Sequence, residues 1–545
     1  MNKSGKKYST IIVGGGIAGL TSAAYLSRAG QKVLLIEKNS ECGGLVNSFT
    51  RDGFHFDAGV RALEDAGIIF PMLQDLGIHL DVVKSPVSLG VENEIIHIEG
   101  KDSLLEYREL LVRLFPESKD ETDQVIKVIR KIMKHMDVLY GIENPVFKDL
   151  KRDWAFVLKK LLPWFPKFVF TVGKINRLNM PVEDYLGIFV KNTSLRDIIS
   201  QHFFKNTPAF FAMSYFSLYL DYFYPKGGVG KLADALRNRI AELGGEILTD
   251  TRIIEVKAGK SLLTDQNNVT YEYGNLIWAA DLKTLYRITE TEGLPQSVKA
   301  VSEDAKNKFF KNRGGDSVFS LFVEVDEPLE SFRKIAHGHF FYTPTRIGLG
   351  EIHRTELDNL ISNFEKADKQ QILTWLDKFT RLNTYEISIP GLKDPALVPS
   401  GKTGLIISFL AEYDLCNKIR GAGWLDEFIS ELENRVLGVI SDSVYPMLKD
   451  KTITHFSFSP LSIENRVGSS EGAITGWAFR ESMPVINRIQ SSGGSVFTPL
   501  PSIYQAGQWT YSPAGVPMSI LTGKLAADRV LKKTKKHRAT DISEA

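Results

Sequence analysis

Short apolar runs and amphipathic stretches alternate along the chain. Residues 9–13 (STIIV) and 32–37 (KVLLIE) have the length and the β-branched composition of buried strands. Between them, residues 14–30 read as a glycine turn that opens a helix, and the helix closes at Gly30. The pattern predicts a compact β–α–β unit near the start of the sequence.

The pattern of apolar positions changes twice along the rest of the chain. Residues 103–140 carry apolar side chains three and four positions apart, which predicts helices. Strand and helix patterns return at 221–290 and again at 456–532. We therefore expect an α/β protein in which a Rossmann-like nucleotide-binding domain is interrupted by a discontinuous α+β substrate domain.

This pattern predicts the domain boundaries. The nucleotide-binding domain is expected in three parts, residues 1–98, 221–290 and 456–532. The substrate domain is expected in two parts, a partly helical lid region at 99–220 and a second part at 291–455. The polar, basic residues 533–545 are expected to be a disordered tail.

Composition narrows the function classes. The chain has 545 residues, 43% of them hydrophobic and 24% charged, which is typical of a folded protein and excludes a fibrous or polytopic membrane protein. The net charge of +2 does not indicate a nucleic-acid partner. The two cysteines, Cys42 and Cys416, exclude a disulfide scaffold, and no metal-binding motif is present. A cytoplasmic location is expected.

A targeting sequence is the alternative for the first residues. Lysines precede an uncharged run at 8–27, as in a signal peptide. Glycines within that run would break an apolar helix, so we favour the strand–turn–helix interpretation.

The turn after the first strand carries a dinucleotide-binding motif. Gly14, Gly16 and Gly19 form a GxGxxG, which supplies a tight turn, a close backbone approach to a pyrophosphate and close packing of helix on strand. The helix N-terminus favours phosphate. Glu37 ends the next strand, where a carboxylate accepts hydrogen bonds from ribose hydroxyls. A glycine-rich turn without a ligand is the alternative.

The following segment resembles a large family of FAD enzymes. GGLVNSFTRDGFHFDAG at 43–59 resembles the glycine pair and the later Asp-x-Gly of the phytoene desaturases, carotenoid isomerases, retinol saturases and flavin amine oxidases. The phrase at 394–401 (DPALVPSG) and the C-terminal block at 503–526 are similar to the desaturase and isomerase branch. Leu45 stands where the family usually has Arg, so backbone N–H groups would bind more of the diphosphate.

The resemblance implies FAD as the cofactor. The FAD is expected to be held non-covalently. Covalent amine oxidases attach their flavin to a Cys shortly upstream of the C-terminal block, and Cys416 lies far upstream of that block here. The residues implied as FAD contacts are Gly14, Gly16, Ala18, Gly19, Glu37, Lys38, Gly43, Gly44, Leu45, Gly59, Val60, Ile253, Gly507, Val516 and Pro517.

The implied reaction is hydride transfer between a carbon of a long apolar isoprenoid, such as a carotenoid, and flavin N5, as a desaturation or a flavin-assisted isomerisation. Arg61, Tyr219 and Trp509 are the expected substrate contacts, and no catalytic residue is assigned. Ten aromatic residues within 203–224 indicate either an apolar tunnel or ordinary core packing. A retinol-saturase-like reductase, an amine or porphyrinogen oxidase of the same fold, and a non-catalytic flavin-binding membrane protein are the alternatives.

Residues 154–172 mix aromatic and basic side chains, with Trp154, Trp164 and Phe168 beside three lysines. This composition indicates either a peripheral membrane contact or a buried lid. The redox partner, whether quinone, oxygen or a nicotinamide cofactor, is not indicated by the sequence.

Overall fold

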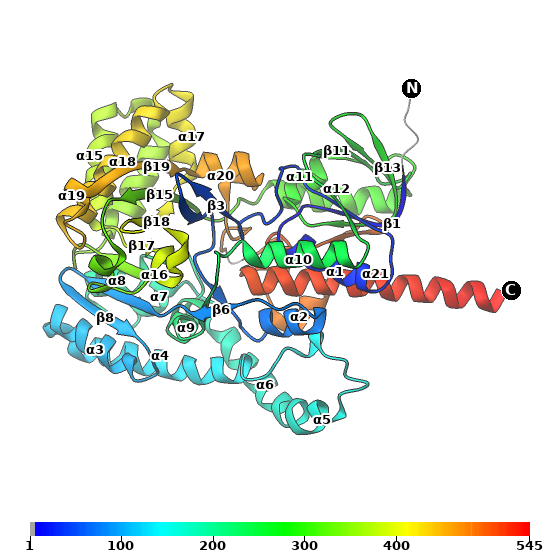
Figure 1. Cartoon of the computed structure of the whole chain (residues 1–545), viewed down its shortest axis with the longest axis horizontal. Helices are drawn as coiled ribbons and strands as arrows, with labels where there is room; N and C mark the ends of the chain where they lie inside the picture. The colour runs from blue at the N-terminus through cyan, green and yellow to red at the C-terminus, as the bar shows by residue number, and fades with distance from the viewer. Residues whose placement is uncertain (1–5, 481, 545) are drawn as a thin grey trace.

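Two β-sheets organise the chain, each in its own lobe (Figure 1). The computed structural model describes residues 6–480 and 482–544. The mixed α/β architecture confirms the predicted fold class.

The first sheet has eight strands in the order β10-β2-β1-β13-β12-β11-β14, and β20 also pairs with β13. The strands are β1 Lys7–Val13, β2 Val33–Ile36, β10 Glu246–Leu248, β11 Ile253–Lys257, β12 Leu262–Asp265, β13 Thr270–Trp278, β14 Thr289–Glu290 and β20 Ile503–Gln505. Strands β10, β2, β1, β13 and β20 run parallel, so their carboxyl ends share one edge.

The second sheet has seven strands in the order β19-β15-β18-β17-β16-β7-β8. They are β7 Val87–Val91, β8 Glu94–Ile98, β15 Ser317–Val325, β16 His339–Thr343, β17 Tyr385–Ser388, β18 Thr403–Ala411 and β19 Thr452–Phe458. Two small sheets join the lobes: β3 Ser48–Arg51 with β4 Phe54–Asp57, and β9 Tyr222–Pro225 between β5 Leu63–Glu64 and β6 Val82–Lys84.

Helices cover both sheets. The first lobe carries α1 Ile17–Arg28, α2 Ile69–Leu76, α10 Lys231–Glu242, α11 Leu282–Ile288, α12 Gln296–Phe310 and α21 Val516–Glu544. One face of the second lobe carries α3 Ser103–Leu114, α4 Lys119–Leu139, α7 Val182–Gly187, α8 Thr193–Ser200 and α9 Ala209–Tyr219. The remaining helices are α13 Leu329–Arg333, α14 Leu357–Ser362, α15 Lys369–Leu382, α16 Pro390–Lys393, α17 Tyr413–Gly421, α18 Leu425–Asp442, α19 Leu448–Lys451 and α20 Pro460–Val467.

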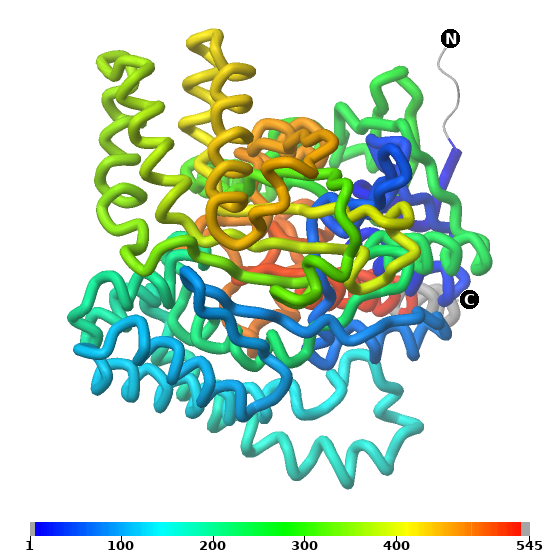
Figure 2. Tube along the Cα trace, turned by 60° about the vertical axis from the view of Figure 1, so that its left-hand side comes forward, coloured from blue at the N-terminus to red at the C-terminus, as the bar shows by residue number. Residues whose placement is uncertain are grey.

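The aromatic and basic segment forms α5 Trp154–Phe156 and α6 Leu162–Ile175, joined by a π-helical turn. Figures 1 and 2 show these helices projecting from the edge of the molecule, away from both sheets. The segment is therefore not a lid buried between the lobes.

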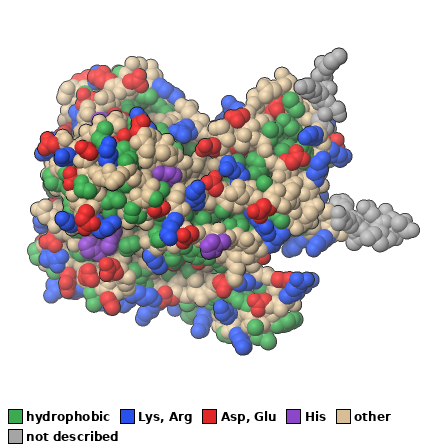
Figure 3. Space-filling model, viewed as in Figure 1, with side chains coloured by type: hydrophobic (Ala, Val, Ile, Leu, Met, Phe, Trp, Pro, Cys, Tyr) green, Lys and Arg blue, Asp and Glu red, His purple; other side chains and the backbone are tan. Residues whose placement is uncertain are grey.

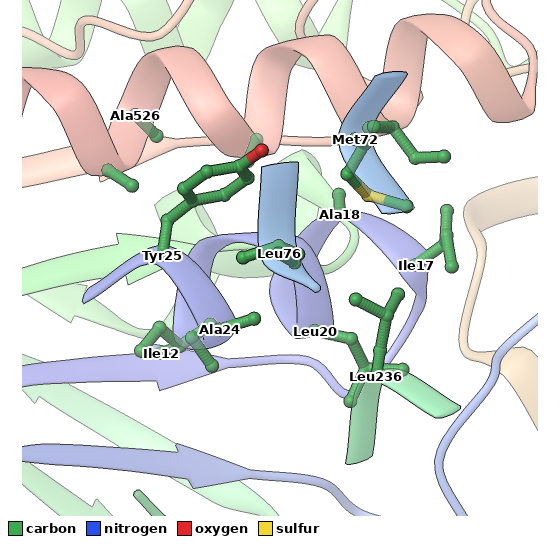
Figure 4. Close-up of a cluster of buried hydrophobic side chains, with 14 of the residues drawn as sticks. Ile12, Ile17, Ala18, Leu20, Ala24, Tyr25, Met72, Leu76, Leu236 and Ala526 are labelled. Carbon is green, nitrogen blue, oxygen red and sulfur yellow. The ribbon is translucent and has the colours of Figure 1, made fainter. Parts of the chain in front are cut away.

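Small side chains on α1 let its neighbours approach closely. A Cβ at Gly523 of α21 would lie 2.4 Å from the carbonyl oxygen of Ala18, so only glycine permits this contact. Tyr25 packs beside the same helix, with Lys524 Nζ 4.7 Å from its ring centroid, and its hydroxyl donates to Asp75 Oδ2 of α2 at 2.9 Å. Figure 4 shows Ala18, Leu20 and Tyr25 packed among residues of α2, α10 and α21. This packing fixes the start of α1, and with it the glycine turn.

The structure departs from the expected boundaries in two places. Strands β7 and β8 lie within the range 1–98, yet they pair in the second sheet. The domain division stays a prediction, and we propose to move its first boundary to before β7.

The tail expected to be disordered continues α21 as far as Glu544, because its Lys, Arg and Ala residues are good helix formers and extend a helix already anchored on α1. Residue 545 lies outside the described residues.

Candidate functional site

Three predicted motifs meet at the carboxyl edge of the parallel strands. Gly14 directly follows β1, Glu37 directly follows β2, and Gly507 comes just after β20. Ligands of open α/β sheets bind at this edge, beside the helix that follows the first strand. The edge is therefore the candidate cofactor site.

The three glycines of the GxGxxG have different surroundings. A Cβ at Gly19 would lie 1.9 Å from the carbonyl oxygen of Gly14, and a Cβ at Gly14 would lie 2.5 Å from that of Ala279. Both glycines are therefore required by the fold. By contrast, no described atom lies within 4 Å of a Cβ at Gly16, so this glycine faces open space.

Gly16 is also the N-cap of α1. Its backbone is extended, with φ −70° and ψ 176°, and no side chain among the described residues caps the helix. The first N–H groups of α1 thus have no side-chain acceptor among the described residues. An uncapped N-terminus beside an open glycine fits a pyrophosphate.

The second glycine pair lies against this turn. The Gly43 amide donates to the Gly15 carbonyl at 2.8 Å, and a Cβ at Gly44 would lie 3.3 Å from the Cα of Gly16. Gly43 and Gly44 have φ of +130° and +60°, which favours glycine at both positions. The two loops therefore line the same space at the start of α1.

Leu45 continues from the glycine pair to Gly59 and Val60. The Val60 amide donates to the Leu45 carbonyl at 3.0 Å, and a Cβ at Gly59 would lie 2.2 Å from the same oxygen. The side chains of Leu45 and Val60 are half-buried. These residues extend the candidate site from the glycine turn toward β5.

Glu37 is 8% exposed, and its carboxylate lies at the glycine turn. Its two oxygens accept from the amides of Gly15 at 2.7 Å and Asn39 at 2.9 Å. Lys38 points the other way, because its ammonium donates to the carbonyl of Asn465 at 3.1 Å, and burial lowers its pKa. Ile253 begins β11 and is buried.

The opposite end of the site is formed by the turn before α21. Val516 is the first residue of this helix and is half-buried, Pro517 is buried, and the preceding Gly515 is exposed. The Gly507 amide donates to Thr522 Oγ1 at 3.0 Å, and a Cβ at Gly507 would lie 3.4 Å from that of Ala18. The C-terminal motif is thus joined to the N-terminal motif through α1.

A buried polar network ties the site to the second lobe. Asp57 is fully buried and accepts from Ser48 Oγ at 2.8 Å, the Tyr224 hydroxyl at 2.8 Å and the Val229 amide at 3.1 Å. The buried Arg61 guanidinium donates to the Asp57 carbonyl. It also donates to the hydroxyls of two serines of the second sheet, Ser320 and Ser408, each at 3.1 Å.

Sequence reasoning missed the charged side chains on the second sheet. His339 Nε2 lies 2.9 Å from Glu386 Oε1, and the Lys393 ammonium donates to the Arg61 carbonyl at 2.8 Å. Burial lowers the pKa of Lys393 to about 8. Burial raises the pKa of Glu386, but His339, Arg61 and Lys393 outweigh it, and the net direction is down. These residues share no local motif, since pairing of β16 with β17 brings His339 to Glu386, and Lys393 comes from α16.

An aromatic cavity of about 60 Å³ lies between α8, α9 and the second sheet. Tyr219 lines it, together with Tyr215, Phe216 and Phe341. Trp509 lies elsewhere: it is 3% exposed in the core of the first lobe, and its carbonyl accepts from Trp477 Nε1 at 2.9 Å. The three expected substrate residues therefore separate, with Tyr219 at the cavity, Arg61 in the polar network and Trp509 in the core.

Neither cysteine is placed to react. Cys42 lies at the glycine turn, where a Cβ at Gly15 would be 2.8 Å from its sulfur, and burial raises its pKa to about 12. Cys416 is buried in the core of the second lobe, and burial likewise raises its pKa to about 12. Among the described residues, no three His, Cys, Asp or Glu side chains are grouped to hold a metal ion.

Comparisons with known proteins place the chain among flavoproteins. The family model described as flavin containing amine oxidoreductase matches residues 17–531. The chain is 22% identical to all-trans-retinol 13,14-reductase of Danio rerio, over 91% of this chain and 82% of that protein. It is 23% identical to carotenoid 3,4-desaturase of Haloarcula japonica, over 95% and 97%.

A solved structure shares the fold. Wild-type putrescine oxidase bound to putrescine superposes with a TM-score of 0.59 at 15% identity, covering 97% of this chain and all of that one.

Proposed function

The chain belongs to the flavin containing amine oxidoreductase family and is a flavin-dependent oxidoreductase, and on that premise we propose that it acts on carbon–carbon bonds of a long apolar isoprenoid. When bound, the flavin supplies hydride acceptance or donation. The chain binds the cofactor, orients the substrate and excludes water.

We propose FAD as the flavin. The uncapped start of α1 and the open face of Gly16 fit its pyrophosphate. Glu37 fits the ribose, because its carboxylate retains acceptor capacity beyond the two amide hydrogen bonds. The turn at Gly515 to Pro517 would face the isoalloxazine, since the N-terminus of α21 favours negative charge.

The isoprenoid proposal rests on the aromatic cavity, and on relatives named as a retinol reductase and a carotenoid desaturase. The cavity is narrow, so its aromatic side chains must turn for a polyene to enter. Desaturation, saturation and isomerisation all use such a site. Mass spectrometry of lipid extracts from cells that express or lack the chain tests the substrate class and the direction.

Direct assays separate the proposal from its rivals. Purified protein is incubated with phytoene, all-trans-retinol or putrescine. Conversion of either polyene supports the proposal. Hydrogen peroxide formed with putrescine, without polyene conversion, would identify an amine oxidase. A flavin that neither reduces nor reoxidises with any of them would favour a non-catalytic flavin-binding protein.

The flavin is expected to be released by acid precipitation. Both thiols are buried, and burial keeps them protonated at neutral pH, so neither is a nucleophile for a tether. The measurement is the absorbance of the supernatant after precipitation, with the protein pellet as its internal comparison. A pellet that stays yellow would contradict non-covalent binding.

We propose that the α5–α6 segment contacts an anionic membrane. Its exposed apolar residues are Trp154, Leu158, Leu162, Phe165, Val169 and Phe170. Figure 3 shows hydrophobic and basic side chains together at this tip. Among the described residues, no helix is both long and apolar enough to cross a bilayer. A contact along the surface is the form of binding that remains for this segment.

The structure corrects which aromatic residues are available to lipid. Trp164 Nε1 donates to the Val138 carbonyl at 2.5 Å, and the Trp164 ring stacks on Phe168 with centroids 4.4 Å apart. Both side chains are half-buried, because they hold α6 against α4. Phe165 and Phe170, 56% and 70% exposed, face solvent instead.

The Phe165→Ser/Phe170→Ser double variant is expected to lose most co-sedimentation with anionic liposomes while its flavin content stays unchanged. Wild-type binding should fall with salt, because Lys159, Lys160 and Lys167 meet the headgroups through screened charges. Ile347→Ser, which removes an exposed apolar side chain elsewhere, is the control and should bind like wild type. Wild-type protein that ignores liposomes at low salt would overturn the membrane contact.

A further inference from the structure

Glu64 lies where the turn before α21 meets the second lobe. It is the second residue of β5 and pairs with Tyr222 of β9 in antiparallel register. A Cβ built at Gly515 would lie 4.0 Å from Glu64 Oε1. The carboxyl group therefore reaches the turn that would face the flavin ring.

Three tyrosines connect Glu64 with the aromatic cavity. The ring centroids of Tyr222 and Tyr219 are 5.9 Å apart, and those of Tyr219 and Tyr215 are 5.8 Å apart. Tyr215 and Tyr219 line the cavity itself. Glu64 thus stands between the end of the cavity and the proposed position of the flavin ring.

Glu64 has no charge partner. Within residues 6–480 and 482–544, no hydrogen-bond donor and no cation contributes to the pKa of its carboxyl group. Burial, and then the charge of Asp221, raise its pKa to about 7. Burial also raises the pKa of Asp221, and the positive charge of Lys84 counteracts part of that rise.

The other titratable groups around Glu64 are neutral or acidic. Burial raises the pKa of Tyr140, Tyr215 and Tyr222, and the charge of Glu64 adds to each shift. The neighbouring Asp65 also has a raised pKa through burial, although it accepts from the amides of Gly67 and Phe70. Glu64 is the carboxyl group here that is left free of hydrogen bonds among the described residues.

We propose that Glu64 exchanges the substrate proton, a role that rests on the proposed function. In a desaturation, adjacent carbons lose a hydride to the oxidised flavin and a proton to the Glu64 carboxylate. The electron pair of the second C–H bond becomes the new C=C bond. In a saturation, the Glu64 carboxylic acid gives the proton and reduced flavin gives the hydride. A carboxyl group that is half-protonated near neutral pH serves either direction.

The first test needs no substrate. Photoreduction of the bound flavin adds negative charge beside Glu64, which raises the pKa of the carboxyl group and draws in a proton near pH 7. A pH-indicator dye in weakly buffered solution measures this uptake. We expect Glu64→Gln to take up fewer protons per flavin than wild type at pH 7. The difference should vanish at pH 5, where Glu64 is already protonated.

Glu386→Gln is the matched comparison, since Glu386 is a second interior carboxylate but is paired with His339. Equal uptake in wild type and Glu64→Gln would overturn the proposal. If the proton uptake falls in Glu386→Gln but not in Glu64→Gln, Glu386 is the group that takes up the proton and the proposal is overturned.

The second test uses phytoene and all-trans-retinol as probes. Glu64→Gln should keep its flavin, yet convert the probe roughly 10²–10⁴-fold more slowly, while Glu64→Asp retains part of the rate. Wild-type turnover in Glu64→Gln would overturn the proton role. If wild type converts neither probe, the isoprenoid proposal fails by itself, and the proton-uptake comparison decides the role of Glu64.

Discussion

The Gly16→Val protein is expected to fold normally and to be colourless. The extended backbone at Gly16 is open to any residue, and no described atom lies within 4 Å of an added Cβ. The fold should therefore lose at most about 1 kcal/mol, the cost of a poorer N-cap. The new side chain fills the space proposed for the pyrophosphate. Flavin affinity should fall at least about 100-fold, or roughly 3 kcal/mol.

Two further variants serve as comparisons for Gly16→Val. Gly100→Val also adds a side chain where no described atom lies within 4 Å, but between β8 and α3, and it should stay yellow. Glu37→Ala should weaken flavin binding by only roughly 1–3 kcal/mol, because it leaves polar partners unpaired without blocking the site. Flavin titration with urea unfolding distinguishes lost binding from lost fold. Equal flavin affinity in wild type and Gly16→Val would show that the cofactor lies elsewhere.

Asp57→Ala is expected to lower the free energy of unfolding by about 2–6 kcal/mol. Its carboxylate is fully buried and accepts from the Tyr224 hydroxyl and the Val229 amide. Each of these donors loses this acceptor, at roughly 1–3 kcal/mol apiece. Because Asp57 joins the loop after the glycine pair to β9 and to the segment before α10, flavin should also be bound more weakly.

Urea unfolding of the Asp57→Ala protein measures the loss. Asp442→Ala is the control, since its carboxylate is 69% exposed in an ion pair with Lys449, and such a change costs about 1 kcal/mol or less. An Asp57→Ala protein as stable as the control would mean that Tyr224 and Val229 find other acceptors.

Local sequence patterns predict the β–α–β unit that begins the first lobe. A strand, GxGxxG and helix within residues 7–28 form a local unit, and their spacing fixes where the turn lies. Parallel strands end at one edge, so Gly14 and Glu37 had to meet there once the strands were assigned. The family resemblance also rests on short local motifs at both ends of the chain, and the family model confirms it.

Which aromatic residues face solvent depends on the packing of the folded chain. Trp164 and Phe165 are neighbours of similar hydrophobicity, yet α4 covers one and leaves the other free. The amino-acid composition does not predict this difference in solvent exposure, because exposure depends on which face of α6 packs against α4. Trp509 stays a predicted substrate contact, but its packing on Trp477, with ring centroids 4.8 Å apart, is a contact between separate segments that the sequence does not show.

The polar groups of the second lobe were also beyond the sequence. Arg61 lies more than 300 residues before Glu386 and Lys393 in the chain, and only the folded structure brings the three side chains together. Glu64 likewise differs from any surface glutamate only through its surroundings. Its place beside Tyr222 and the turn at Gly515 desolvates the carboxyl group, and this burial, followed by the charge of Asp221, raises its pKa to about 7. A pKa of this kind arises from desolvation, which exists only once the chain is folded.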